Sequence, residues 1–424
     1  MGHRRRVSVI IATYNSADLL AETLRQLARQ TIPRDDFEVI VGDDGSTDHT
    51  AAVVRSFADV LHIGYVFQED RGFRVASARN GAARTAVGAL LVILDTGSMV
   101  GPDFLAAHLA AHSGDERRAV IGPSYGYNPE VPMLGVDELL AQLPPEGVVE
   151  RYRHLPEFQD VRQPYFVGCQ MDLSRRTIPW KAFWTGNCSI RTDDFRRLGA
   201  FEERFEGWGG EDMELGYRLH QAGLTIALAP DAWAVVAPHD RDHKANFDEL
   251  FANMRMFLAK FPVPVVEMGL TVMVETGQFW QWEPMYLELL DWQQRARDVD
   301  VRDEIAAALA DLPDGETVTV IGCGGELPAT LTRATLVDFD EELLDRAVRS
   351  GDHSGYHAIG LRTMLADGSA GTVVVTSRMA GLWDSWGPQI LAEAARVGHR
   401  TISYAGPAPR SADPQEIQSE GRAA

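Results

Sequence analysis

Four apolar runs, separated by stretches with helical spacing, occupy the first 95 residues of the chain and restrict its fold more than any other feature. The runs are 7–12, 37–41, 61–67 and 89–94, and they are rich in Val, Ile and Leu, as is typical of strands buried on both faces of a sheet. The stretches 16–30, 47–57 and 75–87 between them have apolar residues at helical spacing. This βαβαβαβ order predicts an α/β fold with a mostly parallel sheet and helices on both faces.

Polar residues follow three of the predicted strands at the point where each strand ends. Thr13 and Tyr14 follow the first run, Asp43 and Asp44 the second, and Asp95 the fourth. Ligands of open parallel sheets bind beyond the carboxyl ends of the strands. We therefore expect these side chains to converge on one crevice.

The residue types at this edge suggest a nucleotide with a charged tail. A carboxylate such as that of Asp44 can accept hydrogen bonds from a base N–H or a ribose hydroxyl. Asp95 beside a diphosphate would require a divalent cation between them, or would bind a sugar hydroxyl instead. Arg71, Arg74 and Arg79 could neutralise phosphate oxygens in bidentate fashion.

The rest of the chain divides by composition. Regularity fades between residues 123 and 179, which we interpret as a long excursion over the site, and a helix follows at 211–222. Residues 247–261 and 268–295 have helical spacing, 298–315 resembles a linker, and a small α/β unit begins at 317. The predicted organisation is a catalytic domain at 1–240, a helical extension at 241–300, a small module at 301–410 and a flexible tail at 411–424.

Charge and cysteine content exclude several classes of protein. A net charge of -21 over 424 residues argues against general binding of nucleic acid or anionic membranes, which needs a basic surface. No apolar stretch reaches the length of a membrane helix, so we expect no membrane insertion. The three cysteines are far apart, which predicts free thiols and a cytoplasmic protein.

Six short motifs, in this order, resemble one family. They are Val-Ile-Ile-Ala-Thr-Tyr-Asn at 9–15, Asp-Asp-Gly-Ser-Thr-Asp at 43–48, Ala-Arg-Asn-Gly-Ala at 78–82, Leu-Asp-Thr-Gly-Ser at 94–98, Phe-Trp-Thr-Gly-Asn-Cys-Ser at 183–189 and Gly-Trp-Gly-Gly-Glu-Asp at 207–212. Together they resemble the inverting nucleotide-sugar glycosyltransferases of family 2, which have the A-type nucleotide-diphospho-sugar transferase fold. The resemblance covers about residues 7–240.

The resemblance implies roles for particular residues. Asp212, with its neighbour Glu211 at a helix start, would be the base that deprotonates the acceptor during direct displacement at the anomeric carbon. The donor, most commonly a uridine diphosphate sugar in this family, would contact Ala12, Tyr14, Asp43, Asp44, Arg71, Arg79, Asp95 and Thr96. The sugar and acceptor pocket would be formed by Trp184, Gly186, Asn187, Trp208, Gly209 and Gly210.

One position departs from the family pattern. The family usually has Asp-x-Asp after the fourth strand, and its second aspartate is the metal ligand, but this chain has Gly97 there. Three alternatives follow: Asp95 and His239 hold Mn²⁺ or Mg²⁺ together with phosphate and water, the enzyme works without a metal, or transfer has been lost. The retained Glu211-Asp212 pair argues against the third.

The C-terminal module begins with a strand, a Gly-rich turn at 322–325 and a second strand that ends at Asp338. This order resembles the start of an S-adenosylmethionine-dependent methyltransferase. The first helix is almost absent, however, and the unit is small. We interpret it as a degenerate Rossmann-like module for acceptor docking or for contact between two copies of the chain.

The sequence thus predicts transfer of a sugar from a nucleoside diphosphate to a soluble acceptor, such as a small metabolite, a peptide or a glycan primer. Two alternatives stay open. One is a regulator that binds the nucleotide sugar without transferring it, and the other is a bifunctional glycosyltransferase–methyltransferase.

Overall fold

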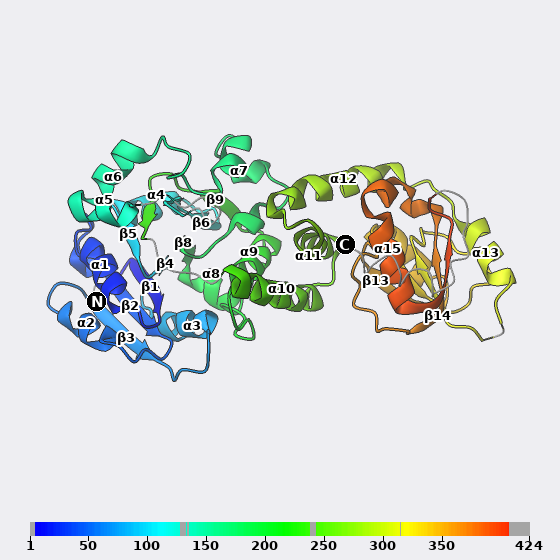
Figure 1. Ribbon diagram of the computed structural model, residues 1–424, viewed down its shortest axis with the longest axis horizontal. Coiled ribbons are helices and arrows are strands. Elements are labelled where there is room, and N and C mark those ends of the chain that lie inside the picture. Colours follow the sequence, from blue (N-terminus) through cyan, green and yellow to red (C-terminus); the bar gives the residue numbers. More distant parts are fainter. Residues whose placement is uncertain (1–4, 128–132, 134, 238–242, 314, 407–424) are drawn as a thin grey trace. The chain divides into compact units, whose positions relative to one another are not determined.

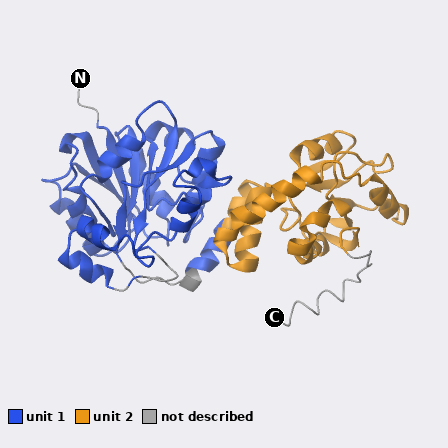
Figure 2. Ribbon diagram, turned by 90° about the horizontal axis from the view of Figure 1, so that it is seen from above, with its two compact units in different colours: residues 1–253 blue, residues 254–424 orange. Residues whose placement is uncertain are grey.

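A computed structural model describes residues 5–127, 133, 135–237, 243–313 and 315–406 (Figure 1). The chain separates into two compact units, residues 1–253 and 254–424 (Figure 2). The division falls within helix α10 (His243–Lys260). Among the described residues, no helix is long and apolar enough to cross a membrane.

Unit 1 contains ten strands and ten α-helices within the described residues, counting α10. The strands are β1 (Val7–Thr13), β2 (Phe37–Asp43), β3 (Ile63–Phe67), β4 (Leu90–Asp95), β5 (Ser98–Val100), β6 (Arg118–Ile121), β7 (Ser124–Tyr125), β8 (Asn187–Arg191), β9 (Thr225–Leu228) and β10 (Ala234–Val236). The helices before α10 are α1 (Ala17–Leu27), α2 (Thr50–Ser56), α3 (Val75–Thr85), α4 (Phe104–Ala111), α5 (Val136–Gln142), α6 (Pro145–Tyr152), α7 (Gln163–Gly168), α8 (Thr192–Arg197) and α9 (Glu211–Gln221). Three 3₁₀ turns are η1 (Arg34–Asp36), η2 (Leu173–Arg175) and η3 (Pro179–Ala182).

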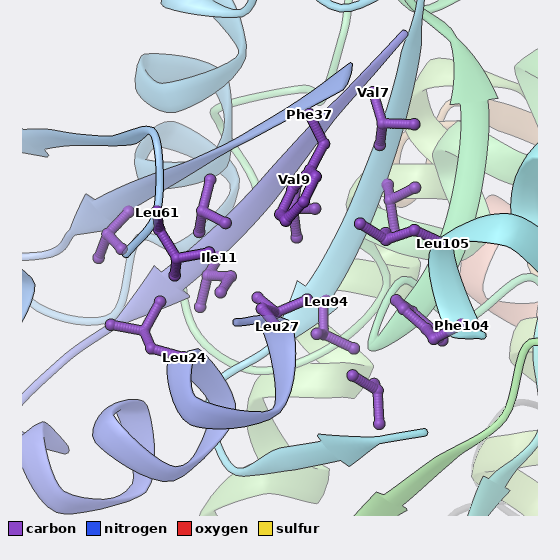
Figure 3. Close-up of a cluster of buried hydrophobic side chains, with 14 of the residues drawn as sticks. Val7, Val9, Ile11, Leu24, Leu27, Phe37, Leu61, Leu94, Phe104 and Leu105 are labelled. Atoms are coloured by element: carbon purple, nitrogen blue, oxygen red, sulfur yellow. The ribbon is translucent and has the colours of Figure 1, made fainter. Parts of the chain in front are cut away.

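The main sheet of unit 1 has seven strands in the order β3-β2-β1-β4-β8-β6-β9. Strands β1 to β4 are parallel, as the alternation predicts, whereas β8 is antiparallel to both β4 and β6. Helices lie on both faces because successive side chains of a buried strand point to opposite sides. On one face, the strand side chains pack against α1, α2 and α4 (Figure 3). The predicted mostly parallel sheet is confirmed.

A second, three-stranded sheet in the order β5-β10-β7 joins distant parts of unit 1. Strand β10 pairs antiparallel with β5, which begins one residue after Gly97. The excursion at 123–179 is more regular than we expect from its sequence, because its described residues include α5, α6 and α7. The first two of these pack on a cluster around Val148 and Phe158. Their short apolar faces give a weak periodicity, which explains why they are hard to predict.

Unit 2 carries its own parallel sheet. Its elements after α10 are α11 (Pro264–Thr276), η4 (Phe279–Gln281), α12 (Trp282–Arg295), α13 (Arg302–Ala310), β11 (Val318–Ile321), β12 (Thr335–Asp338), α14 (Glu341–Val348), β13 (Ser354–His357), β14 (Ala370–Val375), η5 (Ser377–Leu382), α15 (Trp383–Val397) and β15 (Gly398–Ser403). The strand order is β13-β12-β11-β14-β15, and all pairs are parallel. This is the order 3-2-1-4-5 of a doubly wound sheet, so the Rossmann-like prediction is confirmed.

Two details of unit 2 bear on the expected linker and on the methyltransferase alternative. The linker predicted at 298–315 is wrong in part, because α13 lies within it and buries Ile305 in the core of the module. Residues 322–334, all of them described, contain no helix, as the sequence predicts. A doubly wound sheet without this helix lacks the N-terminus on which a Gly-rich turn would hold an anion.

The acid at the end of β12 is already paired within the protein. Asp338 is 1% exposed and accepts hydrogen bonds from Arg378 Nε at 2.9 Å and from the Gly324 N–H at 2.9 Å. Arg378 is itself fully buried. Because a nucleoside would need this carboxylate for its ribose, the arrangement argues against the bifunctional alternative.

The three cysteines, Cys169, Cys188 and Cys323, are free and buried. Burial raises the pKa of the Cys188 and Cys323 thiols well above their usual value. These two side chains therefore behave as apolar packing residues and not as nucleophiles, in agreement with the sequence prediction of free thiols.

The close contact between β2 and α3 gives a test of the fold. A Cβ at Gly42 would lie 2.3 Å from the Ala78 carbonyl oxygen, whereas a Cβ at Gly64 on the next strand meets nothing nearer than 3.6 Å. We expect Gly42→Ala to destabilise unit 1 by about 1–3 kcal/mol through overpacking and Gly64→Ala to have little effect. Thermal unfolding followed by near-UV circular dichroism compares the two. Equal melting temperatures would contradict the packing described.

Candidate active site

The carboxyl ends of β2, β1 and β4 bring the predicted donor residues to one edge of the sheet. The register pairs Thr13 with Asp43 on one side of β1 and Ala12 with Asp95 on the other. The Thr96 hydroxyl donates to the Ala12 carbonyl at 2.8 Å. The expected convergence of the strand ends is thus present in the structure.

The two aspartates that follow β2 differ in their surroundings. Asp43 is fully buried and accepts from the Gly45 and Ser46 N–H groups and from the Tyr65 hydroxyl at 2.6 Å. Burial and this hydrogen bond raise the pKa of Tyr65 above its usual value. Asp43 therefore shapes the loop, and we assign it no direct contact with a ligand.

Asp44 follows the end of β2 and is held by the segment after β3. It accepts from the Arg74 N–H at 2.6 Å and from Gln68 Nε2 at 2.6 Å. Nearby, the half-exposed Tyr14 donates its hydroxyl to Asp70 at 2.8 Å, which raises the pKa of Tyr14. This wall of the crevice is thus hydrogen-bonded before any ligand binds. Gln68 and Asp70 are residues that sequence reasoning missed.

The three arginines predicted for phosphate binding, Arg71, Arg74 and Arg79, lie in different places. Arg74 lies 3.7 Å from Asp44. Arg71 is exposed, and within the described part of the chain its ion pair is with Glu69 at 3.0 Å, away from the strand ends. Arg79, on α3, is 4% exposed and lies between two carboxylates, Asp95 at 2.8 Å and Glu211 at 3.0 Å. Burial alone would lower the pKa of Arg79, but these acids outweigh burial and raise it. Arg79 therefore connects the end of β4 to the start of α9.

Glu211 and Asp212 open helix α9, where the N-terminal dipole favours negative charge. Glu211 is 6% exposed and pairs with Arg79 through one oxygen, while the other oxygen, Oε2, is buried and bonds to none of the described residues. Desolvation, followed by the charge of Glu211, raises the pKa of Asp212 to about 8. Asp212 thus has the proton affinity of a group that can exchange a proton near neutral pH.

A glycine-rich loop leads into α9 and positions these acids. Gly207, Gly209 and Gly210 all have positive φ, between 78° and 93°, a conformation that other residues rarely adopt. The loop is held from α10, because the Trp208 N–H donates to Glu249 at 2.6 Å and the Gly209 carbonyl accepts from Asn253 at 2.7 Å. The predicted pocket residues of this loop therefore lie directly before Glu211 and Asp212.

The opposite wall comes from the segment before β8. A Cβ at Gly186 would lie 2.9 Å from Asp95 Oδ2, so glycine leaves room for that carboxylate. Trp184 is half-buried, and the buried guanidinium of Arg162 lies 5.0 Å from its ring centre. Arg162 also pairs with buried Asp160 at 2.7 Å. The Asp160–Arg162 pair supports this wall, and no motif in the sequence indicates it.

Asn187 does not line the pocket, because its side chain is used inside the sheet. It is 1% exposed, its amide nitrogen donates to the Pro123 and Ala232 carbonyls at 3.2 and 2.8 Å, and its oxygen faces His108 Nε2 at 3.1 Å. The prediction that the Asn187 side chain forms part of the pocket therefore needs correction. The side chain instead fixes the loop that carries Gly186.

Asp95 is an accessible candidate ligand for a divalent cation at the carboxyl ends of the strands. The Asp95 side chain is 52% exposed, and carboxylate oxygens suit Mg²⁺ and Mn²⁺. No group of three or more His, Cys, Asp or Glu side chains is arranged to hold a metal among the described residues, and His239 lies outside them. Gly97 has φ of 86°, and a Cβ there would point at Leu19 of α1. The residues present fit a cation held by Asp95 and completed by ligand oxygens.

Carboxylates at the carboxyl ends of parallel strands, joined by a buried arginine to an acid pair at a helix start, define a glycosyltransferase site of the A-type fold. The family model of "Glycosyl transferase family 2" matches residues 8–160, and that of "N-terminal domain of galactosyltransferase" matches residues 166–238. The chain belongs to glycosyl transferase family 2 and is a glycosyltransferase.

Several known proteins are similar over most or part of the chain. Validoxylamine A glucosyltransferase of Streptomyces hygroscopicus subsp. jinggangensis is 44% identical over 94% of this chain and 97% of its own length. The chondroitin synthase of Escherichia coli is 32% identical over 54% of this chain and 34% of its own. Among solved structures, mannosyltransferase PcManGT from Pyrobaculum calidifontis in complex with GDP-Man and Mn²⁺ is 23% identical, with a TM-score of 0.44, over 73% of this chain and 77% of its own.

The buried position of Asn187 generates a prediction. Asn187→Ala leaves two carbonyl groups and the His108 ring without partners, and each unpaired buried group costs about 1–3 kcal/mol. We expect a marked fall in melting temperature with an unchanged KM for donor in the folded fraction. Thermal unfolding and initial-rate kinetics test this. A raised KM at unchanged stability would instead indicate direct contact with substrate.

Proposed function

We propose that the enzyme is an inverting glycosyltransferase that moves glucose from a nucleoside diphosphate, UDP in the first instance, to a hydroxyl of a small soluble acceptor. The observation that carries this proposal is the pairing of Asp95 and Glu211 through Arg79, with Asp212 next to Glu211. A donor-binding carboxylate and a candidate base thereby belong to one charge network.

The donor's nucleotide is proposed to bind along the ends of β1 and β2, and its diphosphate near Asp95. Tyr14 and Asp44 lie at the nucleotide end, and Asp44 is only 6% exposed. Arg79 has a buried, fixed charge, which can stabilise negative charge that develops on the leaving diphosphate. In this proposal Asp43, Thr96 and Ala12 support the donor site through the backbone.

The chemical step is a single displacement. The acceptor hydroxyl oxygen forms a bond to the anomeric carbon while the bond from that carbon to the diphosphate oxygen breaks, which inverts the configuration. Asp212 takes the hydroxyl proton, and the bond electrons leave with the nucleoside diphosphate. A general base with a pKa near the working pH is effective in such a transfer.

A bound divalent cation would neutralise charge on the departing diphosphate. In this chain Asp95 would hold it, and His239 is the additional ligand proposed from sequence. Arg79 keeps Asp95 in place through its 2.8 Å ion pair. Burial, and then the negative charge of the neighbouring Glu211, raise the pKa of Asp212 and so its affinity for the acceptor's proton.

The acceptor is proposed to be a small hydroxylated molecule related to validoxylamine A. The support is the 44% identity, over nearly the whole length of both chains, to an enzyme named for glucose transfer to that compound. Trp184 and the glycine loop before α9 would receive the acceptor, because the loop leads directly into Asp212 and Trp184 lies two residues before Gly186, which contacts Asp95.

Replacing the candidate base gives the first test. We expect Asp212→Asn to reduce kcat by at least about a hundredfold, as loss of general base catalysis does, while Kd for the donor stays within about twofold. Asp193→Asn is the matched control, because Asp193 occupies the first turn of α8 and is exposed. Isothermal titration and product analysis by NMR separate binding from transfer. Transfer at the wild-type rate in Asp212→Asn would refute the base assignment.

The pH dependence gives a second test. A base acts only when ionised, and the pKa of Asp212 is raised to about 8, so kcat/KM should rise with pH between 6 and 8 and level off above. The rise in kcat/KM between pH 6 and 8 should disappear from the residual activity of Asp212→Asn and persist in Asp193→Asn. Initial rates at constant ionic strength measure it. A flat profile from pH 5 upward would show that the reacting base has an ordinary carboxylate pKa.

A further inference from the structure

A cavity in unit 1 lies at the amino end of β4, whereas Asp95 of the candidate active site lies at the carboxyl end of that strand. It has a volume of about 450 Å³ and is lined by Arg5, Arg6, Ala89, Leu90, Leu109, His112, Ser113 and Arg191. Leu90 begins β4, which ends at Asp95, so about 16 Å of strand separates the two places at about 3.3 Å per residue. The cavity is therefore distinct from the donor site.

Three arginines at this cavity are only loosely neutralised, in a chain whose net charge is -21. The contacts from Arg5 to Glu38 and from Arg6 to Asp36 are 3.6 and 3.5 Å, longer than the 2.7–2.9 Å, roughly, of a strong charged hydrogen bond. Arg191 donates to the carbonyl oxygens of His112 and Gly114. These dipoles balance only part of its charge, so the cavity favours an anion.

A buried chain of hydrogen bonds determines which ring nitrogen of His112 carries the proton. The Asn187 oxygen can only accept, so His108 Nε2 carries a proton, and burial lowers the pKa of His108 to about 3, which keeps the ring neutral. His108 Nδ1 is then an acceptor for the Ser189 hydroxyl at 2.8 Å. Ser189 in turn accepts from His112 Nε2 at 2.9 Å.

Because Nε2 of His112 carries the proton, the second ring nitrogen, Nδ1, can only accept a hydrogen bond. Burial, with the charge of Arg191, lowers the pKa of His112 to about 4, so its ring is neutral and Nδ1 carries no proton. Among the residues that the structure describes, neither His112 Nδ1 nor Arg5 Nε has a hydrogen-bond partner, and both atoms are buried inside the protein. Unpaired buried polar atoms of this kind are rare in native proteins, and here both belong to residues that line one cavity.

We propose that this cavity is a binding site for a phosphate group, either inorganic phosphate or a small phosphate ester. Phosphate oxygens accept bidentate hydrogen bonds from guanidinium groups. His112 also lines the cavity and, being neutral, adds no negative charge to it. The apolar wall of Ala89, Leu90 and Leu109 fits the carbon skeleton of an ester.

The test uses the full chain with methyl-labelled leucines. Potassium phosphate is titrated against potassium chloride of equal ionic strength, and then glucose 1-phosphate in the same way. Leu90 and Leu109 report this cavity, while Leu19, beside Gly97, reports the catalytic crevice. We expect saturable shifts at Leu90 and Leu109. Equal affinities would identify the phosphate group as the ligand, and at least fivefold tighter binding of the ester would identify an ester.

Variants decide whether the arginines bind the anion. Arg191→Gln should weaken phosphate binding about tenfold, the value of one charged hydrogen-bond contact. Arg6→Gln, at a side chain that is 54% exposed, should weaken binding without disturbing the fold. Arg84→Gln, at an exposed pair with Glu203, is the charge-matched control and should change nothing. The proposal would be overturned if Leu90 and Leu109 showed no saturable shifts up to roughly 20 mM of either probe, the weakest useful affinity. It would also be overturned if the Arg191 and Arg6 variants bound phosphate as tightly as the wild type.

Discussion

The buried guanidinium of Arg79 is the interaction on which the catalytic crevice depends. A charge removed from water is tolerated only when it is paired, and the partners of Arg79 come from residues 16 and 132 positions further along the chain. The requirement for two carboxylates therefore brings the end of β4 and the start of α9 together. Without the guanidinium of Arg79, the negative charges of Asp95, Glu211 and Asp212 would repel one another.

The same principle recurs at the other edges of the fold. Asp160 and Arg162 form a buried pair beneath Trp184, and Asp338 and Arg378 form one at the end of β12. In unit 2, buried Glu267 of α11 accepts the N–H groups of residues 359–362. Each pair fixes a loop where strands end and backbone groups lack partners. Loops beside the seven-stranded sheet of unit 1 and the sheet of unit 2 are thus held by buried charged side chains whose partners the protein itself supplies.

The sequence predicts the parts of the site that are local. Strand ends at Asp43 and Asp95 and the helix start at Glu211 follow from periodicity and from residue type, and the structure has all three. What a single sequence does not contain is the pairing across the chain. Nothing near Asn187 indicates that its amide is consumed by two distant carbonyls, and nothing near Arg71 indicates that it stays exposed while Arg79 is buried. Such outcomes depend on tertiary contacts that periodicity does not record.

Gly97 is consistent with the pairing of the site's carboxylates by Arg79. Its φ of 86° is a conformation that residues with side chains rarely adopt, whereas a Cβ there would make only an ordinary 3.6 Å contact with Leu19, so the backbone itself favours glycine at this position. With Asp95 as the one acid of that motif, the crevice carries less negative charge beside the diphosphate than an Asp-x-Asp site would. The diphosphate then depends more on arginine, and Arg79 is already in contact with Asp95. In the proposed donor site, the diphosphate therefore relies on the fixed charge of Arg79 as well as on any cation that Asp95 holds.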